Sequence, residues 1–485
     1  MIGAVSSRAA ARPVATARLL HTAALAGLAF AAAPAIGFAA SGEGYYEPSY
    51  VAGSYDAAGR FMGGTELRTL VAHGGRLYAG NGYWEDRPGP EGPQGAAILV
   101  LDAPAARWRV EHVFDERLPN GRARDFTVST LSRIRFDTDG NGARLPAPVA
   151  MLAASTWDLT GATRVFTRSD ANGSWTAATL SQDPPARDFL PQIRSIFTYR
   201  DKATGLARVF AGNSPRGIFS GAYDPRVAGS IRWDAAPELG VGGNPTAGLS
   251  GPSGRLRISS FAECNGSLYA AIGQQIYQRI DGATPSWRAV YTNPRPGGHS
   301  ESGLRGLTAI ANPGGAGEVL LAAVEGDMAR ILRFDLATGS ETQELDLRRF
   351  LSDAWQTQVG YVIAAYNDMA KFHDSKSGDV LLIGLEAFIP PQAPTPAGHA
   401  IVDLGHGRVE GGGWYLVRYR DAHYDLHQIA APAGTALVAT RSIVPSPFPG
   451  DSNALYFAGY DANKAPAHNT AWVIRADSSV LSVAK

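Results

Sequence analysis

Arginine occupies one repeated position in this sequence, two residues before the apolar core of a predicted strand. The position is filled by Arg68, Arg194, Arg305 and Arg441; Arg133 and Arg257 lie near it in their segments, and Asn367 replaces it once. The planar guanidinium group suits a carboxylate, sulfate or phosphate, so convergence of these positions predicts a cradle for an anionic ligand. Like charges in a partly dry site are costly unless paired. The alternative is therefore that each arginine pairs with a carboxylate or a backbone carbonyl and fastens the fold.

Aromatic and acidic side chains occur in loops that we expect on the same side as these arginines. The candidate ligand-binding aromatics are Trp84 and Trp157, and Tyr83 and Tyr460 lie in the same kind of loop. The neighbouring acids are Glu85, Asp86, Asp158, Glu325, Asp327 and Asp461. Aromatics with polar neighbours around a cavity are typical of sugar-binding clefts, which favours an acidic carbohydrate as the ligand. The alternative is that the aromatics roof the centre of the fold.

Two side chains could move a proton beside the arginines. His299 lies just before Arg305, where an imidazole could act as a base, and Tyr460 is the other candidate. In a uronate lyase, Arg305 and Arg194 would neutralise the substrate carboxylate while His299 or Tyr460 moved the proton at the neighbouring carbon. In a glycosidase, two loop acids would act as acid and base or nucleophile. The sequence does not distinguish an enzyme from a non-catalytic protein that binds a protein or cell-surface partner.

A separate motif, Phe136–Gly142, has the spacing of the first half of a calcium loop. Asp137, Asp139 and Asn141 alternate there and a glycine follows, and oxygen ligands at alternate positions can surround one Ca²⁺ ion. The twelfth position from Asp137 is Pro148, which excludes the helix–loop–helix version. The motif predicts a structural calcium ion away from the arginines, and the alternative is an ordinary Asn-Gly hairpin turn.

Short strands joined by hairpins must position all these residues. The stretch Leu67–Phe114 is predicted to form four antiparallel strands, with a turn at Gly74–Gly75. First hairpins of the same kind begin at Leu70, Arg135, Ile196, Phe261, Leu307, Met369 and Ile443. This repetition predicts an all-β fold, a seven-bladed β-propeller of four-stranded antiparallel blades. The first strand of each blade would line the central channel and place the arginines at its mouth. Because the sixth unit, Tyr361–Ala431, is the least regular, the alternative is six blades plus a β-rich extension.

Two turns resemble the Asp-box, the turn motif of sialidase-like propellers. The segment SDANGSW at Ser169–Trp175 is one residue short between glycine and tryptophan, and IDGATPSW at Ile280–Trp287 is looser. The resemblance implies the propeller architecture and no particular activity. Tryptophans recur in the return strands of the second hairpins, where we expect them to pack between neighbouring sheets. They are Trp108, Trp175, Trp233 and Trp287.

The first forty residues have the composition of an export signal. Arg8, Arg12 and Arg18 precede an apolar core, Leu19–Ala33, and small residues follow to Ala40. The core is short for a membrane span of about 20 residues, so we predict cleavage rather than anchoring. The predicted parts are a signal peptide at residues 1–40, a lead-in at 41–66 and a single propeller at 67–485. The mature protein would be secreted or periplasmic.

The overall composition and the missing motifs argue against several classes of partner and enzyme. Lys plus Arg equals Asp plus Glu at 44 each, so no global field favours nucleic acid as a partner. Cys264 is the single cysteine, which excludes an internal disulfide. The sequence has no Gly-rich phosphate loop, no Gly-x-Ser-x-Gly and no His-Glu-x-x-His. We expect a monomer without a membrane span that recognises an anionic small molecule or glycan, with calcium as the one candidate cofactor.

Overall fold

A computed structural model describes residues 46–83, 95–183, 191–214, 216–240, 257–297, 303–394, 400–403, 408–430, 437–460 and 469–482. The described residues are almost entirely β-strand and loop. Their helices are α1 (Leu347–Trp355) and the short 3₁₀ segments Ala228–Ser230 and Ser478–Ser482. None of these helices is long and apolar enough to cross a membrane. The chain after residue 44 forms one compact unit, and the predicted signal peptide lies outside the described residues.

The first four-stranded meander shows how the sequence directs the fold. Its strands β4 (Glu66–His73), β5 (Arg76–Gly82), β6 (Ala97–Leu101) and β7 (Arg109–Val113) pair antiparallel in chain order. Gly74 and Gly75 have φ angles of 57° and 72°, the left-handed conformation that a two-residue hairpin needs and that glycine adopts without strain. The predicted unit Leu67–Phe114 is confirmed.

The same meander recurs along the chain. The next copies are β8 (Asp125–Thr138), β9 (Arg144–Asp158), β10 (Ala162–Arg168) and β11 (Trp175–Gln182), then β12 (Gln192–Arg200), β13 (Ala207–Ser214), β14 (Gly217–Tyr223), β15 (Ile231–Trp233) and β16 (Leu239–Gly240). They continue with β17 (Ile258–Cys264), β18 (Ser267–Ile272), β19 (Gln275–Ile280) and β20 (Ser286–Thr292), then β21 (Leu304–Ala311), β22 (Glu318–Val324), β23 (Arg330–Asp335) and β24 (Ser340–Asp346).

The sixth unit departs from this plan at its inner strand. Both β25 (Tyr361–Ala364) and β26 (Ala370–Asp374) pair with β27 (Gly378–Ile389), so the strand is interrupted at residues 365–369. Two more strands, β30 (Trp414–Arg418) and β31 (Tyr424–Gln428), complete the sheet. The hairpin of β28 (Ala400–Asp403) and β29 (Arg408–Gly411) extends the end of β27. This interruption becomes important for the candidate site.

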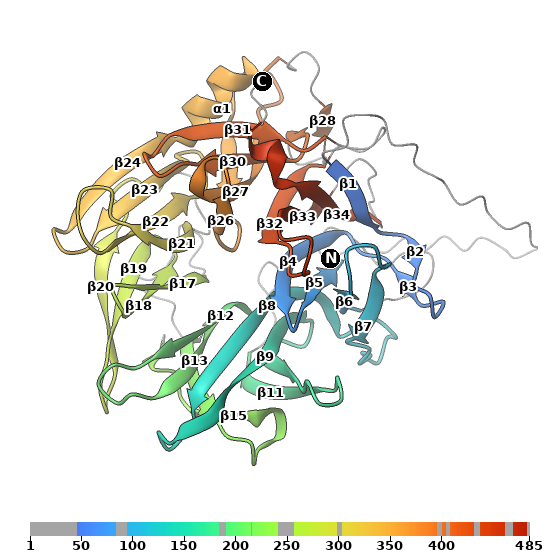
Figure 1. Cartoon of the computed structure of the whole chain (residues 1–485), viewed down its shortest axis with the longest axis vertical. Coiled ribbons are helices and arrows are strands. Elements are labelled where there is room, and N and C mark those ends of the chain that lie inside the picture. Colours follow the sequence, from blue (N-terminus) through green and yellow to red (C-terminus); the bar gives the residue numbers. More distant parts are fainter. Residues whose placement is uncertain are drawn as a thin grey trace, which may run out of the picture. The chain divides into compact units, whose positions relative to one another are not determined.

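The last sheet joins the two ends of the described chain. It contains β32 (Ala439–Pro445), β33 (Ala454–Tyr460), β34 (Ala471–Asp477) and β1 (Tyr46–Val51), in which β1 pairs with β34. A small hairpin of β2 (Ser54–Tyr55) and β3 (Phe61–Met62) follows β1. Part of the predicted lead-in thus supplies the outer strand of the last sheet. Figure 1 shows the sheets arranged in a ring with β4, β8, β12, β17, β21 and β32 towards its centre, which is the architecture of a β-propeller.

Hydrogen bonding does not divide the described residues into the seven separate sheets that the repeat predicts. Six sheets have four or more strands, because β4–β7 and β8–β11 are joined in one sheet. The junction is a single residue pair, Gly82 with Thr127. A side chain at Gly82 would collide with the backbone of Thr127, so glycine is required for this close approach. The all-β propeller class is confirmed, whereas the sheets alone do not define the number of blades.

Apolar side chains fill the space between neighbouring sheets. One cluster joins Leu77 and Trp108 of the first meander to Tyr456 and Val473 of the last. The predicted packing of the return-strand tryptophans is confirmed, since each contacts such a cluster. Burying one large apolar side chain contributes about 2–3 kcal/mol. Cys264 is buried and free, so packing between sheets takes the place of a disulfide in holding the ring together.

Candidate functional site

The inner strands surround a cavity of about 320 Å³ at the centre of the ring. Every meander contributes to its lining, through residues 69–71, 130–133, 194–197, 259–261, 307, 367–368 and 442. Many of the lining side chains carry hydroxyl groups: Thr69, Thr130, Ser132, Ser195, Ser259, Ser260 and Ser442. The cavity is therefore a channel with a polar, hydroxyl-rich wall, and the repeated arginines lie where the inner strands begin.

Three of the four predicted arginines are buried and already paired with carboxylates. Arg68 Nε donates to Glu66 Oε2 at 2.5 Å, and Arg441 Nε donates to the other oxygen of Glu66 at 2.7 Å. Arg305 Nε donates to Glu325. Burial alone would raise the pKa of Glu66, but the two guanidinium groups beside it lower the pKa below its ordinary value. These three arginines therefore fit the alternative prediction, in which each arginine pairs with a carboxylate or backbone carbonyl and fastens the fold.

Arg194 differs from Arg68 in the group that stands two residues before it. Glu66 precedes Arg68, whereas Gln192 precedes Arg194, and Arg194 Nε donates to the amide oxygen of Gln192 at 3.1 Å. Arg194 makes no ion pair with any described carboxylate. Burial lowers the pKa of Arg194 to about 9; Tyr366 opposes this effect, and the nearby charges of Arg257, Arg305 and Arg68 add to it. A guanidinium in such surroundings lacks the anion that its neighbours have.

Tyr366 lies at the centre of the arginines. The guanidinium carbons of Arg441, Arg305, Arg68 and Arg194 lie 4.2, 4.5, 5.7 and 5.8 Å from the centre of its ring. Its backbone oxygen accepts a hydrogen bond of 3.0 Å from Arg305 Nη1. Burial raises the pKa of Tyr366, but the arginines outweigh burial and lower it to about 8. A tyrosine with this pKa is partly ionised near neutrality, and its phenolate form can accept a proton.

The interruption of the sixth inner strand places Tyr366 there. Ala365 has a φ of 50°, which is unusual for a residue with a side chain, and it turns the chain out of the sheet between β25 and β26. Sequence reasoning missed Tyr366. The signal was present, because the sixth unit carries Tyr366-Asn367-Asp368 where other units carry arginine. Irregular strands often aim side chains at functional sites.

We call this group the mouth cluster: Arg68, Arg194, Arg257, Arg305, Arg441, Tyr366, Glu66, Glu325 and Glu386. Arg441 Nη1 also lies 2.7 Å from Glu386 Oε2 in an ion pair, although this N–H does not point at the oxygen. The charge of Arg257 helps to lower the pKa of both Glu325 and Arg194. Among the described residues, the mouth cluster thus holds five guanidinium groups and three carboxylates.

Two charged side chains face the channel below the mouth cluster. Asp368 is surrounded by protein yet accessible to the channel, and burial raises its pKa to about 6. Arg133 is exposed along the channel wall. Neither side chain makes a hydrogen bond or ion pair with the residues that the structure describes. A carboxylic acid with a pKa near 6 can donate a proton at neutral pH.

The structure brings together part of the predicted site. Trp157 packs its ring against Arg68 and Arg194, at 4.7 and 6.0 Å from their guanidinium carbons, and its Nε1 donates to Gln192. The tryptophan therefore orients the arginines. The Tyr460 hydroxyl donates to Glu386, and its ring lies 5.2 Å from the Arg441 guanidinium carbon. Trp84 and His299 lie outside the described residues.

The predicted calcium residues form the turn between β8 and β9. Asp137 pairs with Arg200, and Asp139 Oδ1 accepts from the backbone N–H groups of Asn141 and Ala143 at 2.9 Å each. Within the described part of the chain, no cluster of three or more His, Cys, Asp or Glu side chains could hold a metal. Calcium can also take backbone and Asn side-chain oxygens as ligands, so calcium binding here stays a prediction. Melting temperatures with calcium and with a chelator would test it.

Comparison with known proteins adds architecture and no activity. No protein-family model and no curated protein sequence matches this chain. Among solved structures it is similar to a putative exo-β-1,3-galactanase from Bifidobacterium bifidum, at 10% identity and a TM-score of 0.33, covering 80% of this chain and 99% of that one. It is also similar to Trypanosoma rangeli sialidase in complex with the inhibitor DANA, at 10% identity and a TM-score of 0.37, covering 89% of this chain and 58% of that one.

A third similar structure is the β-propeller domain of Swd1 from Myceliophthora thermophila, at 9% identity and a TM-score of 0.41, covering 84% of this chain and 97% of that one. The expected resemblance to sialidase-like propellers is confirmed at the level of architecture. Propellers of one shape host unrelated functions, so the function must be argued from the site.

Proposed function

We propose that this protein is an exported propeller that recognises an anionic ligand, an acidic carbohydrate, at the mouth of its central channel. The observation that carries the proposal is Arg194, a half-buried guanidinium on the channel wall that has an amide partner in place of a carboxylate and has three other guanidinium groups nearby. One carboxylate or sulfate group would supply the missing partner. The hydroxyl-rich channel wall below it suits a ligand that carries many hydroxyl groups.

The same geometry supports a lyase for uronic-acid polymers. Arg194 neutralises the substrate carboxylate, which acidifies the neighbouring C–H bond. The Tyr366 phenolate accepts that proton, a carbon–carbon double bond forms, and the bond to the leaving oxygen breaks. Asp368, two residues further along the same interruption, donates its proton to that oxygen. Arg305 holds the Tyr366 backbone and Tyr460 holds Glu386, so both act as positioning residues; His299 remains a second candidate base.

The proposed propeller has seven blades. We infer seven blades because the four-strand meander occurs seven times in the described strands, counting β4–β7 and β8–β11 separately. One bridge pair is a small part of two meanders that otherwise pair internally. Electron density that shows Gly82 and Thr127 in one continuous blade would contradict this count.

The proposal is tested by a panel of acidic and neutral oligosaccharides with the wild type and Arg194→Ala. Acidic sugars are expected to raise the melting temperature of the wild type and not of the variant, and neutral sugars to have no effect on either. Turnover would appear as absorbance of the new double bond. We expect the rate to be highest between pH 6 and 8, between the pKa values of Asp368 and Tyr366, because the reaction needs Asp368 protonated and Tyr366 ionised. The rival function is a non-catalytic propeller that binds a protein or cell-surface partner. It gains support if no acidic sugar stabilises the wild type.

A further inference from the structure

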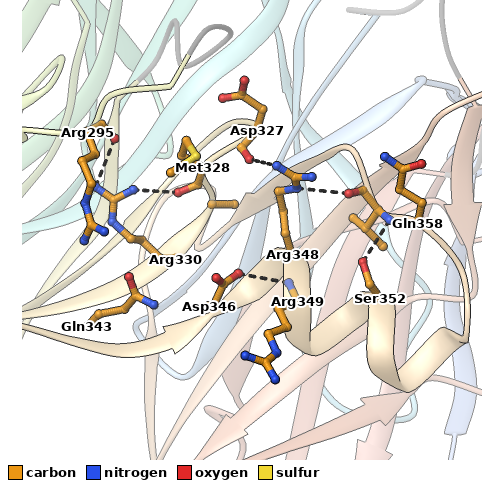
Figure 2. A pocket seen from close by; sticks show the side chains of 12 residues that line it. Arg295, Asp327, Met328, Arg330, Gln343, Asp346, Arg348, Arg349, Ser352 and Gln358 are labelled. Atoms are coloured by element: carbon orange, nitrogen blue, oxygen red, sulfur yellow. Dashed lines mark hydrogen bonds between the residues drawn. The ribbon is translucent and has the colours of Figure 1, made fainter.

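A second group of arginines lines a pocket where the connection from β20 to β21 meets β23 and α1. The pocket has a volume of about 400 Å³. We call it the rim pocket, and its charged lining consists of Arg295, Arg330, Arg348, Arg349, Asp327 and Asp346 (Figure 2). Four guanidinium groups and two carboxylates line it, and two further carboxylates lie nearby, Glu341 at 3.9 Å from Arg295 and Asp353 at 3.7 Å from Arg349. Arginine thus predominates among the charged lining residues, as it does in the mouth cluster.

Arg330 is the buried centre of the rim pocket, and its hydrogen-bond partners among the described residues are all neutral groups. It is 2% exposed. Its Nη2 donates to Asn293 Oδ1 at 2.6 Å and to the backbone oxygen of Arg295 at 3.1 Å, and its Nη1 donates to the backbone oxygen of Met328 at 2.9 Å. Its Nε has no hydrogen-bond partner in the described chain. A buried cation without a carboxylate is costly, and burial together with the nearby Arg295 lowers the pKa of Arg330.

The equivalent position between the first and second meanders shows what Arg330 lacks. Arg164 also stands near the start of a third strand and faces the connection from the preceding meander. That connection supplies Glu116 at 2.8 Å, and Asp125, the first residue of β8, lies at 2.5 Å. Burial alone would lower the pKa of Arg164, but these carboxylates raise it. At the rim pocket the described part of the corresponding connection supplies the Asn293 amide in place of these carboxylates, which would leave the position of the anion to a ligand.

Other arginines line the same pocket. The Arg295 side chain is 54% exposed and lies 3.9 Å from the Glu341 carboxylate. Arg348 is held in place because it donates to the backbone oxygens of Asp327 and Val359, and Arg349 follows it in the first turn of α1 (Figure 2). A fixed buried guanidinium beside an exposed one can bind a carboxylate or sulfate through several hydrogen bonds.

The rim pocket and the mouth cluster share one loop. Glu325, the partner of Arg305 in the mouth cluster, is two residues before Asp327 of the rim pocket, a chain distance of at most about 7 Å. We infer that the rim pocket is a second anion subsite, for one carboxylate or sulfate group, and that the ligand is a polymer with repeated acidic groups. The polymer part of this inference rests on the proposed function.

Inorganic sulfate tests the subsite independently of the sugar. The measurement is the sulfate-dependent rise in melting temperature of the wild type, Gln192→Glu, Asn293→Asp and the double variant, at constant ionic strength with chloride. Each substitution supplies an internal carboxylate, to Arg194 or to Arg330. We expect each single variant to keep part of the rise and the double variant to lose it. If Gln192→Glu alone removes the whole rise, the rim pocket binds no anion. If Asn293→Asp alone removes it, the rim pocket is supported and the mouth site fails.

Ligand length tests the polymer. A uronate monosaccharide and a tetrasaccharide are titrated calorimetrically against the wild type, Arg295→Ala and the control Arg288→Ala, an exposed arginine on β20. We expect the wild type and the control to bind the tetrasaccharide at least tenfold more tightly than the monosaccharide. Arg295→Ala should lose this advantage with its affinity for the monosaccharide unchanged. The inference would be overturned if Arg295→Ala preferred the tetrasaccharide as strongly as the wild type does, or if neither protein preferred it over the monosaccharide.

Discussion

Arg68 and Arg194 occupy the same place in two inner strands and differ in one neighbouring group. Each packs against Trp157 and Tyr366, and each donates its Nε to the side chain two residues earlier. That side chain is the carboxylate of Glu66 in one case and the amide of Gln192 in the other. The pKa of Arg68 is raised, despite burial, by Glu66, whereas the pKa of Arg194 is lowered. An amide in place of a carboxylate thus separates an arginine that fastens the ring from one that can bind a ligand.

Gln192→Glu should remove this difference and have the largest effect. The new carboxylate can still accept from Trp157 and Arg194, and it occupies the place of the ligand's charge. We expect affinity for an acidic sugar to fall at least about 30-fold, since a desolvated charge pair contributes about 2–5 kcal/mol. Calorimetry measures the change. Gln428→Glu, on the outer strand β31, is the control for added charge, and equal affinities of the two variants would contradict the comparison.

Glu66→Gln makes the opposite change. It leaves Arg68 and Arg441 without their shared carboxylate in a buried site, which costs about 3–5 kcal/mol of unfolding free energy. Urea unfolding followed by tryptophan fluorescence measures the loss. Glu47→Gln, whose side chain is 64% exposed, should change stability by less than about 1 kcal/mol. A Glu66→Gln protein as stable as the wild type would show that Glu66 does not fasten the ring.

The pH dependence of ligand binding should show the effect of Tyr366, which lies beside both Arg68 and Arg194. Because the pKa of Tyr366 is lowered to about 8, its phenolate forms as the pH rises through 8 and competes with the ligand for the guanidinium groups. We expect affinity for an acidic sugar to be constant from pH 6.5 to 7.5 and to fall above pH 8, by up to tenfold per pH unit. Titrations of Tyr366→Phe should lack the part of the fall that belongs to the phenolate, so that its pH profile differs from that of the wild type. A fall that is the same in both proteins would assign it to another group.

Asp368→Asn extends the comparison to a carboxylate that lacks an arginine, with the smallest expected effect. The pKa of Asp368 is raised from 3.8 to about 6 in the folded protein, so its contribution to stability is present below pH 3.8 and is lost as the pH rises through 6. The variant should therefore melt a few degrees above the wild type at pH 7, with the difference shrinking towards pH 4. Scanning calorimetry at the two pH values checks the sign. A variant less stable than the wild type at pH 7 would show that Asp368 has a stabilising partner.

The sequence by itself determined the class of fold and the place of the arginines. Strand and turn signals such as Leu67–Phe114 with its Gly74–Gly75 turn are local, and their repetition leaves a ring of sheets as the way to cover every edge. A fixed position in a repeated unit falls at a fixed place in the ring, so the convergence of Arg68, Arg194, Arg305 and Arg441 was predictable. The return-strand tryptophans followed from the same logic.

Only the tertiary structure decided which arginines are paired and what lies between them. Pairing depends on carboxylates distant in sequence, as in Arg441 with Glu66, and an ion pair depends on distances of a few ångströms that no local pattern contains. Tyr366 reaches the cluster because the sixth inner strand breaks at Ala365, and the closure of the last sheet by β1 joins the two ends of the chain. Arg194 could be read from the sequence as one arginine among several. Its lack of a carboxylate is visible only when all the neighbouring strands are in place.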